Sequence, residues 1–458
     1  MHSPQISHPT ATDKPIDVVA VIDRCRFSPL QRWIMFLSFF VIAVDGFDTV
    51  AVGYVGPVLA ARWGVSRVAL GPLFSAALVG LAIGALFAGP LGDRVGRKRI
   101  LIGSVAFFGL CTLASACAGS LQQLTVLRLL TGLGLGAAMP NAVTLLSEYA
   151  PRKHRSLLVN VMFCGFALGA SGGGFAAAWL IPALGWQSIF VIGGAVPIAL
   201  ALLLFTMPES LTFMVARGYP AARISAVLAR IDRSFKASAA GYRVPAQETA
   251  GGKSPLSILF SAQFRIGSYL LWLTYFMGLV VYYLLTSWMP TLMREAGFDL
   301  GQSARMTALL SLGAGVGPLL LGWLMDRMNA YRVVAAGFAL AGCFVWLAGV
   351  TVTDGDVLPW VIFTTGTFLA GALTSMPAIA ASYYPVAARA SGVAWMLGIG
   401  RFGGVVGAFA GGPLLAAGLS IAQIMGLLAI PSCIAAAALL AQSRRLTGEP
   451  VLAAPVLH

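Results

Sequence analysis

Apolar runs long enough to cross a lipid bilayer recur along almost the whole chain, and they restrict its fold more than any other feature. The stretches 100–127 and 156–208 contain no charged residue. A transmembrane helix needs about 20 mostly apolar residues in succession, whereas a strand of a membrane barrel alternates apolar and polar residues over about 10. Only 10% of the residues are charged, compared with about 25% in soluble domains. The sequence therefore predicts an all-α integral membrane protein.

Twelve such runs predict twelve transmembrane helices. Their expected starts lie near Trp33, Leu70, Ile100, Leu121, Ser156, Trp186, Ile266, Gly301, Val333, Val357, Ala390 and Ser420. A polar stretch separates the sixth run from the seventh. We expect two six-helix bundles at 33–207 and 266–443, a cytoplasmic linker at 208–265, and cytoplasmic tails at 1–32 and 444–458.

Lysine and arginine residues are concentrated in alternate connections between the predicted spans. If the N-terminus is cytoplasmic, 24 of the 30 basic residues fall in the tails, the linker or the cytoplasmic loops. This is the bias that the positive-inside rule describes. It predicts that both termini are cytoplasmic, and it explains the net charge of +14 without a nucleic-acid partner. We expect a multi-pass protein of a bacterial-type inner membrane.

The linker contains one segment with helical periodicity. Ile224, Val227, Leu228 and Ile231 recur at helical spacing among arginines. This pattern predicts an amphipathic helix that lies against the inner leaflet. A plain tether between the two bundles is the alternative.

The two halves of the chain resemble each other. The run from Gly89 to Arg94 has a counterpart from Gly322 to Arg327, at an offset of 233 residues. Tyr149, Pro151 and Arg155 are matched by Tyr383, Pro385 and Arg389, at an offset of 234. Two nearly equal offsets indicate a duplicated six-helix unit, which is typical of transporters that rock two bundles about a central site.

The loop between the second and third predicted helices reads GPLGDRVGRKR from position 89 to 99. It resembles the GxxxDRxGR[RK] loop of the major facilitator superfamily, and Pro208-Glu209-Ser210 resembles that superfamily's PES sequence. The resemblance implies a gating role for Gly89, Asp93, Arg94, Gly96 and Arg97. The second copy keeps Asp326 and Arg327 but then departs, with Asn329 and Tyr331 where the Gly-Arg pair should follow, so we expect a weaker latch there.

The first predicted helix contains Asp45-Gly-Phe-Asp48 within SFFVIAVDGFDTVAVGY. This pattern resembles the aromatic acid:proton symporters of the same superfamily. Further agreement with this family covers 129–141, 145–149, 271–280, 285–293 and 395–403, and the stretches of the seventh and eleventh helices resemble the 4-hydroxybenzoate/protocatechuate branch most. The resemblance implies proton-coupled import of an aromatic carboxylate. A proton-driven exporter on the same fold is the alternative, but exporters commonly carry a Gly-Pro in the fifth helix, and 169–175 lacks proline.

Charged residues within the predicted spans need compensation, because each costs roughly 2.5–3.5 kcal/mol at the bilayer centre. Asp45 and Asp48 are three residues apart and therefore share a helix face. Two carboxylates in one low-dielectric site cannot both ionise cheaply, so we expect at least one to carry a transported proton. Arg128 and Glu148 complete the proton-coupling set. Arg128 could pair with any of the three acids, and a purely structural pair is the alternative.

A second group of residues suits an aromatic carboxylate. Arg401 lies in a span with no other charge, and no acid within the spans of its own half could pair with it. Because guanidinium groups bind carboxylates bidentately, we expect Arg401 to anchor the substrate. Among the many aromatic residues, Trp395, Tyr54 and Tyr275 are candidates to stack on the ring, with lipid contact or packing as the alternative for each.

The sequence lacks the residue patterns that other classes of protein need. The four histidines are His2, His8, His154 and His458, at the termini or in a loop. There is no nucleophile–base constellation, no Cys-x-x-Cys pair and no metal cluster, so we expect neither an enzyme nor a bound metal or cofactor. A solute receptor would need an attached signalling domain. The expected partners are a small aromatic acid, protons and lipid, and we expect the protein to act as a monomer.

Overall fold

The computed structural model describes residues 15–25, 27–232, 235, 241–243 and 255–448. The expectations for the remaining parts of the two tails and the linker lie outside these residues. Within the described ranges, twelve helices are long and apolar enough to cross a membrane. Each begins within four residues of the start that the sequence predicts.

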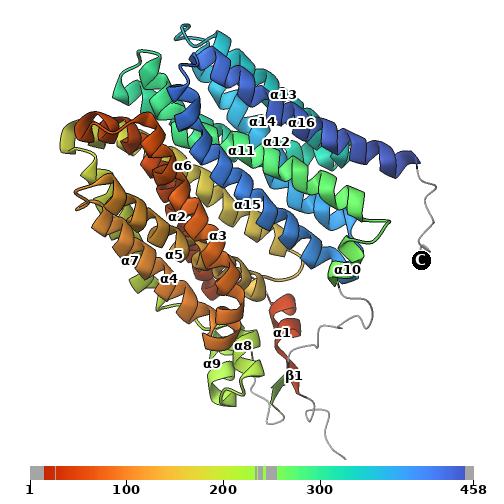
Figure 1. Cartoon of the computed structure of the whole chain (residues 1–458). Coiled ribbons are helices and arrows are strands. Elements are labelled where there is room, and N and C mark those ends of the chain that lie inside the picture. Colours follow the sequence, from red (N-terminus) through yellow and green to blue (C-terminus); the bar gives the residue numbers. More distant parts are fainter. Residues whose placement is uncertain (1–14, 26, 233–234, 236–240, 244–254, 449–458) are drawn as a thin grey trace, which may run out of the picture.

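The helices form two groups of six, which we call the N-bundle and the C-bundle (Figure 1). The N-bundle consists of α2 (Pro29–Trp63), α3 (Arg67–Val95), α4 (Arg97–Ser115), α5 (Leu121–Tyr149), α6 (Arg155–Leu184) and α7 (Gln187–Leu204). The C-bundle consists of α11 (Arg265–Glu295), α12 (Leu300–Met325), α13 (Ala330–Val350), α14 (Leu358–Tyr383), α15 (Val386–Ala416) and α16 (Ile421–Gly448).

The packing within the bundles follows the sequence repeat. In the N-bundle, α3 packs on α5, α2 on α6 and α4 on α7; in the C-bundle, α12 packs on α14, α11 on α15 and α13 on α16. The bundles meet where α6 contacts α12, α3 contacts α15 and α2 contacts α11. These contacts are also related by the repeat, since α3 corresponds to α12 and α6 to α15.

Glycines allow the closest helix pairs to touch through their backbones. A Cβ atom on Gly169 of α6 would collide with the backbone of Ala43 in α2, and one on Gly46 of α2 would collide with the backbone of Phe166. Small residues at such positions let membrane helices approach closely enough for van der Waals packing to hold them together. Gly46 directly follows Asp45 in α2, so this contact also fixes the direction in which the helix face with Asp45 and Asp48 points.

The remaining elements lie mostly at one end of the molecule, which we call the linker end. They are β1 (Ile16–Asp17), α1 (Val18–Arg24), α8 (Leu211–Ala216), α9 (Ala221–Ile231), β2 (Tyr242–Arg243) and α10 (Pro255–Leu259), with β1 and β2 paired in parallel. Figure 1 shows α1, α8 and α9 together below the N-bundle. We call the opposite end the distal end.

The amphipathic segment of the linker is helical, but its apolar face is covered by protein. Ile224 and Leu228 of α9 are buried in one cluster with Val18 and Ile22 of α1 and with residues of the N-bundle. This face is therefore not available to the inner leaflet, contrary to our expectation. The reason is that the segment before α2 forms its own amphipathic helix, which offers α9 an apolar partner.

Two substitutions in α6 test the role of close backbone contact. Gly169→Ala should lower the thermal stability of the purified protein, because the added Cβ meets the α2 backbone and overpacking costs about 1–3 kcal/mol. Gly172→Ala is the matched control, since no atom lies within 4 Å of its Cβ position and alanine favours a helix by about 1 kcal/mol over glycine. Equal stability of the two variants would contradict this account of the α2–α6 contact.

Candidate functional site

A buried ion pair links α2 to α5 at the centre of the N-bundle. Arg128 Nη1 donates to Asp48 Oδ1 at 2.9 Å. The Arg128 side chain is fully buried and that of Asp48 is 1% exposed. Of the three acids that could pair with Arg128, the structure places Asp48 against it.

Hydroxyl groups surround the Arg128 guanidinium. Its Nη2 donates to the hydroxyls of Thr112, Ser115 and Thr131 at 3.0–3.2 Å, and the Thr112 hydroxyl also donates to Asp48. The guanidinium carbon lies 4.9 Å from the ring centroid of Phe190. Sequence reasoning missed these residues. Thr131 lies three residues after Arg128 on one helix face and could have been found, but Thr112 and Ser115 come from α4 and Phe190 from α7, so they depend on helix packing.

Asp45 is buried without an ionic partner. The residue is 4% exposed, and its Oδ1 atom has no hydrogen-bond partner among the described residues. Thr49, one turn further along α2, can hydrogen-bond the carboxyl group, and Asp48 and Arg401 lie within electrostatic range. The two aspartates therefore differ: Asp48 is paired with a cation, and Asp45 is not.

Arg401 reaches from the C-bundle to the N-bundle. Its Nη1 donates to the backbone carbonyl of Leu81 in α3 at 2.8 Å. Gly400 and Gly404 on either side of it pack against the rings of Tyr275 and Tyr283, where a Cβ would collide. The absence of these two side chains brings α15 onto α11, so Arg401 lies at the bundle interface, near both tyrosines.

Of the three aromatic candidates from the sequence, only Tyr275 lies beside Arg401. Tyr54 is buried in α2, where its hydroxyl donates to the Ala170 carbonyl at 3.4 Å. Trp395 lies about 9 Å nearer the linker end than Arg401 by the helical rise. There it stacks on Trp272 with ring centroids 5.8 Å apart.

A small cavity lies next to the ion pair at the interface of the bundles. Its volume is about 20 Å³, measured as the space open to the centre of a water-sized sphere. Its lining residues come from α2, α3, α5 and α11 and include Asp48, Thr49, Phe74, Leu81, Tyr283 and Ser287. This space suffices for one or two water molecules, so a larger ligand requires the bundles to separate.

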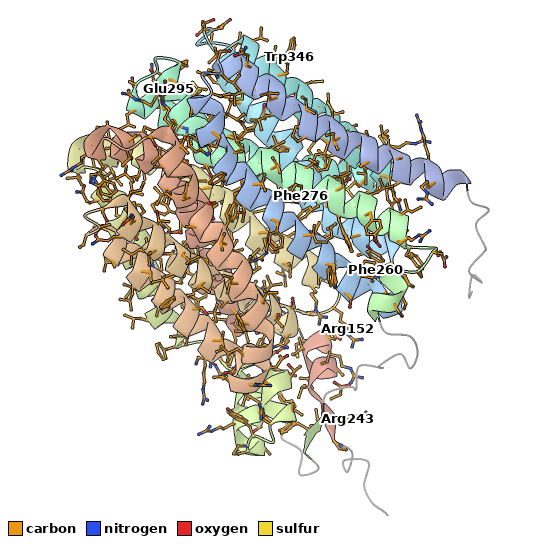
Figure 2. All side chains as sticks on the ribbon, viewed as in Figure 1. Arg152, Arg243, Phe260, Phe276, Glu295 and Trp346 are labelled. Carbon is orange, nitrogen blue, oxygen red and sulfur yellow. The ribbon has the colours of Figure 1, made fainter. Side chains whose placement is uncertain are left out.

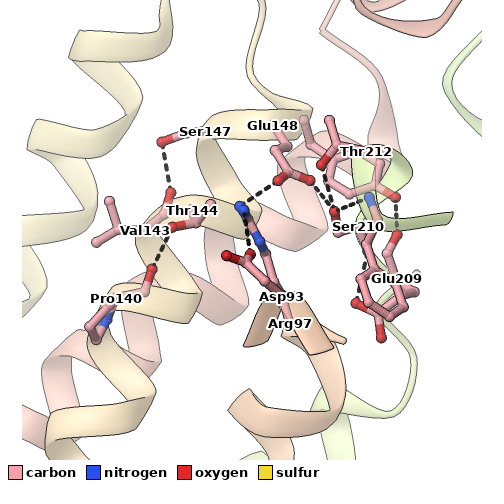
Figure 3. Close-up of polar contacts among 12 residues, drawn as sticks. Asp93, Arg97, Pro140, Val143, Thr144, Ser147, Glu148, Glu209, Ser210 and Thr212 are labelled. Carbon is pink, nitrogen blue, oxygen red and sulfur yellow. Dashed lines mark hydrogen bonds and ion pairs between the residues drawn. The ribbon is translucent and has the colours of Figure 1, made fainter. Parts of the chain in front are cut away.

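Glu148 lies at the linker end, in a network with the loop that resembles the gating motif (Figure 3). Arg97 Nη1 donates to Glu148 at 2.5 Å, and Arg97 Nη2 donates to Asp93 at 3.2 Å. The Ser210 hydroxyl donates to the other oxygen of Glu148. Glu148 therefore lies apart from Asp45 and Asp48, and it joins α4, α5 and the start of α8. We call this network the latch.

The glycine and the PES sequence of the latch have specific structural roles. Gly96 has a φ of +110°, a conformation that favours glycine. A side chain there would also meet Glu209. Glu209 Oε1 accepts a hydrogen bond from the backbone nitrogen of Lys98 at 2.9 Å, so its carboxylate caps the N-terminus of α4. Arg94 contributes its backbone carbonyl, which accepts from Arg217 at 2.9 Å. Gly89 lies within α3.

The second copy of the motif lacks this network. No ion pair of Asp326 is found in the described parts of the chain, and Arg327 lies over the ring of Trp323 at 3.9 Å. Asn329 caps α13 instead, because its side chain accepts from the Arg332 backbone nitrogen.

The bundles are closed against each other at the distal end, where Figure 2 shows Glu295 far from Arg152 and Arg243. Arg67 of α3 lies 2.6 Å from Glu295 of α11. Nearby, the rings of Phe74 and Trp288 meet edge to face with centroids 4.8 Å apart. Because both charged side chains are partly exposed, the ion pair contributes roughly 0–1 kcal/mol. Burial of the two rings therefore provides most of the free energy of this contact.

Two repeated six-helix bundles define a membrane transporter of the two-bundle, alternating-access class. In the described residues, Asp45 has no ionic partner and Arg401 bonds only a backbone carbonyl across the bundle interface. The chain belongs to the Major Facilitator Superfamily, which matches residues 38–308 and 271–455. It is a multi-pass inner-membrane transporter and not an enzyme.

Two relatives are similar over nearly their full length. The "4-hydroxybenzoate transporter PcaK" of Pseudomonas aeruginosa is 47% identical, with 93% of this chain and 95% of the relative aligned. The "Gallate transporter" of Pseudomonas putida is 46% identical, with 97% and 99% aligned. Among solved structures, a D-xylose-proton symporter shares the fold, with a TM-score of 0.70 at 16% identity over 90% of this chain and 97% of that one.

The Asp48–Arg128 pair can be tested by removing one partner or both. Arg128→Met alone should destabilise the protein by about 3–5 kcal/mol, because it leaves a buried, uncompensated carboxylate. Asp48→Leu combined with Arg128→Met should recover most of the thermal stability, because no charge remains buried. Thermal unfolding of the three proteins in detergent measures both effects. If the double variant is no more stable than Arg128→Met, then loss of charge compensation is not the cause of the instability.

Proposed function

We propose that this transporter imports hydroxylated benzoates together with protons by alternating access. The proposal rests on two neighbouring residues at the interface of the bundles, Arg401 and Asp45. Among the described residues, Arg401 makes no ion pair with an acid, and Asp45 makes none with a cation. The names of the two relatives support the substrate class, since 4-hydroxybenzoate and gallate are both hydroxylated benzoates.

Arg401 has the properties of a carboxylate anchor. Its only hydrogen bond in the described part of the chain goes to a neutral carbonyl. A carboxylate makes a stronger, charge-assisted hydrogen bond to a guanidinium and can occupy two of its nitrogens. The substrate therefore displaces Leu81 from Arg401, while Tyr275 and Tyr283 lie beside its ring.

Asp45 has the properties of the proton carrier, whereas Asp48 is already paired with Arg128. A charged Asp45 would be buried without an ionic partner in the described residues, which is costly, so we assign the transported proton to this residue. When it loses that proton, Arg401 is the nearest cation for which it can compete. Protonation of Asp45 therefore frees Arg401 for the substrate, and loss of the proton favours substrate release.

This competition couples the two ligands without a change in net charge. Moving one anion inward against a membrane potential costs about 2.3 kcal/mol per 100 mV. A proton that travels with the anion cancels this term. When Asp45 is protonated and a substrate carboxylate is bound to Arg401, the protein carries one proton and one anion together. The scheme therefore accounts for uptake against the potential.

The two ends of the molecule provide the gates. We assign the linker end to the cytoplasm on the charge bias, which makes the closed distal end periplasmic. Glu148 then acts within the cytoplasmic latch instead of in proton transfer, because its partners are Arg97 and Ser210. All of the latch contacts described above lie in the N-bundle or the linker, as expected when the cytoplasmic side is open. We expect a monomer to suffice.

Asp45→Asn should separate proton coupling from substrate binding. The variant mimics the protonated acid, so it should exchange labelled 4-hydroxybenzoate across proteoliposomes but lose at least about tenfold of the accumulation that an inward proton gradient drives. Uptake and counterflow in the same vesicles measure the two activities.

The control is Asp354→Asn. Asp354 lies in the loop between α13 and α14, where its Oδ1 accepts hydrogen bonds from the backbone nitrogens of Asp356 and Val357. An asparagine side chain can accept the same hydrogen bonds. Its uptake should equal that of the wild type. Normal accumulation by Asp45→Asn would show that Asp45 is not the proton carrier. Transport of 4-hydroxybenzoate only outward, down an imposed gradient, would contradict import.

A further inference from the structure

The cavity beside Asp48 has no role in the exchange between Asp45 and Arg401. It lies between α2, α3 and α11, on the distal side of Arg401. Leu81, whose carbonyl accepts from Arg401, lines one end. Phe74, which packs on Trp288 at the closed distal end, lines the other.

One buried acceptor of the cavity-lining residues lacks a hydrogen-bond donor. Asp48 uses Oδ1 for Arg128 and Thr112, but its Oδ2 is buried and has no partner among the described residues. An orphaned carboxylate oxygen in a dry site is costly. Because the Asp48 side chain is 1% exposed and lines the cavity, a ligand in the cavity can supply the missing donor.

Ser287 brings a hydroxyl from the opposite bundle to the same cavity. It is 7% exposed, and in the described residues its side chain makes no hydrogen bond to protein. Its position is fixed by Gly53 of α2, where a Cβ would lie only 2.9 Å from the Ser287 carbonyl oxygen. Asp48 of the N-bundle, with its unpartnered oxygen, and Ser287 of the C-bundle therefore line one space.

The length of this space suits a benzoate. Leu81 and Phe74 are seven residues apart on α3, which corresponds to about 10 Å along the helix. A benzene ring with its carboxylate on Arg401, at the Leu81 level, directs its para position towards the cavity. The bundles must part slightly to admit the ring, because the present volume of about 20 Å³ holds only water.

We propose that this cavity is the subsite for a hydroxyl group para to the carboxylate of the substrate. The phenolic hydroxyl donates to Asp48 Oδ2 and accepts from Ser287, so both bundles are bridged by one ligand group. This assignment rests on the proposed function. The two relatives fit it, since 4-hydroxybenzoate and gallate share a para hydroxyl.

The subsite makes a specific demand on the ligand, namely a hydrogen-bond donor and not merely a polar atom. Benzoate leaves Asp48 Oδ2 without a donor unless water remains in the cavity. A 4-methoxy group also lacks the donor and is larger. Sites built to bind a hydroxyl reject analogues without it, because the buried partner is left unpaired.

The test compares uptake of 4-hydroxybenzoate, benzoate and 4-methoxybenzoate by Ser287→Ala, Ser287→Thr and wild type in proteoliposomes. The wild type should favour 4-hydroxybenzoate over the other two acids. Ser287→Ala should lower that preference by about fivefold, the effect of one lost hydrogen bond. Ser287→Thr keeps the hydroxyl and should retain most of the preference.

Ser311→Ala is the matched control, because the Ser311 hydroxyl is buried in the same bundle but donates to the Thr307 carbonyl of its own helix. It should leave the preference unchanged. An unchanged preference in Ser287→Ala, with 4-hydroxybenzoate still transported, would overturn the subsite and leave only water in the cavity. No uptake of any of the three acids by the wild type would instead refute the proposed function.

Discussion

The ion pair between Arg128 and Asp48 is the interaction on which the central site depends. The Arg128 guanidinium has no exposed surface, and Asp48, three hydroxyls and one aromatic face contact it. A buried cation of this kind depends on such a partner, because an unpaired buried charge is strongly destabilising. This arrangement uses one oxygen of Asp48. Two consequences follow for the acids of α2. Asp45 is left without a cation, and the second oxygen of Asp48 is left without a donor.

Those two consequences divide the site into functional parts. Burying a charged acid without a partner is costly, which is why we propose Asp45 as the proton carrier. An unpaired buried acceptor favours a ligand donor, which makes Asp48 suitable for recognising a hydroxyl. The two aspartates share one face of α2, but Arg128 gives them different chemistry. A single cation in α5 thus explains why the helix carries two acids.

Most of the fold could be predicted from the sequence, because lipid requires every span to be helical and apolar. The twelve helix starts follow from this constraint, and the repeated packing follows from the matched motifs of the two halves. The partners of the charged residues could not be predicted, since they depend on helix rotation. Glu148 lies in the same helix as Arg128 yet pairs with Arg97, and Trp395 lies in the helix of Arg401 yet stacks away from it. The buried face of α9 was missed because its partner, α1, carries only a short apolar pattern.

Arg401 also connects substrate binding to the movement of the bundles. Its hydrogen bond to Leu81 is a contact between α15 and α3, and α3 also closes on α11 at the distal end. In the mechanism that we propose, a substrate carboxylate on Arg401 replaces that contact, so binding weakens one link between the bundles in the conformation seen here. A ligand shifts a conformational equilibrium only by its different affinity for the two states. The exchange of a backbone carbonyl for a carboxylate at Arg401 supplies such a difference, at the point where the two bundles meet.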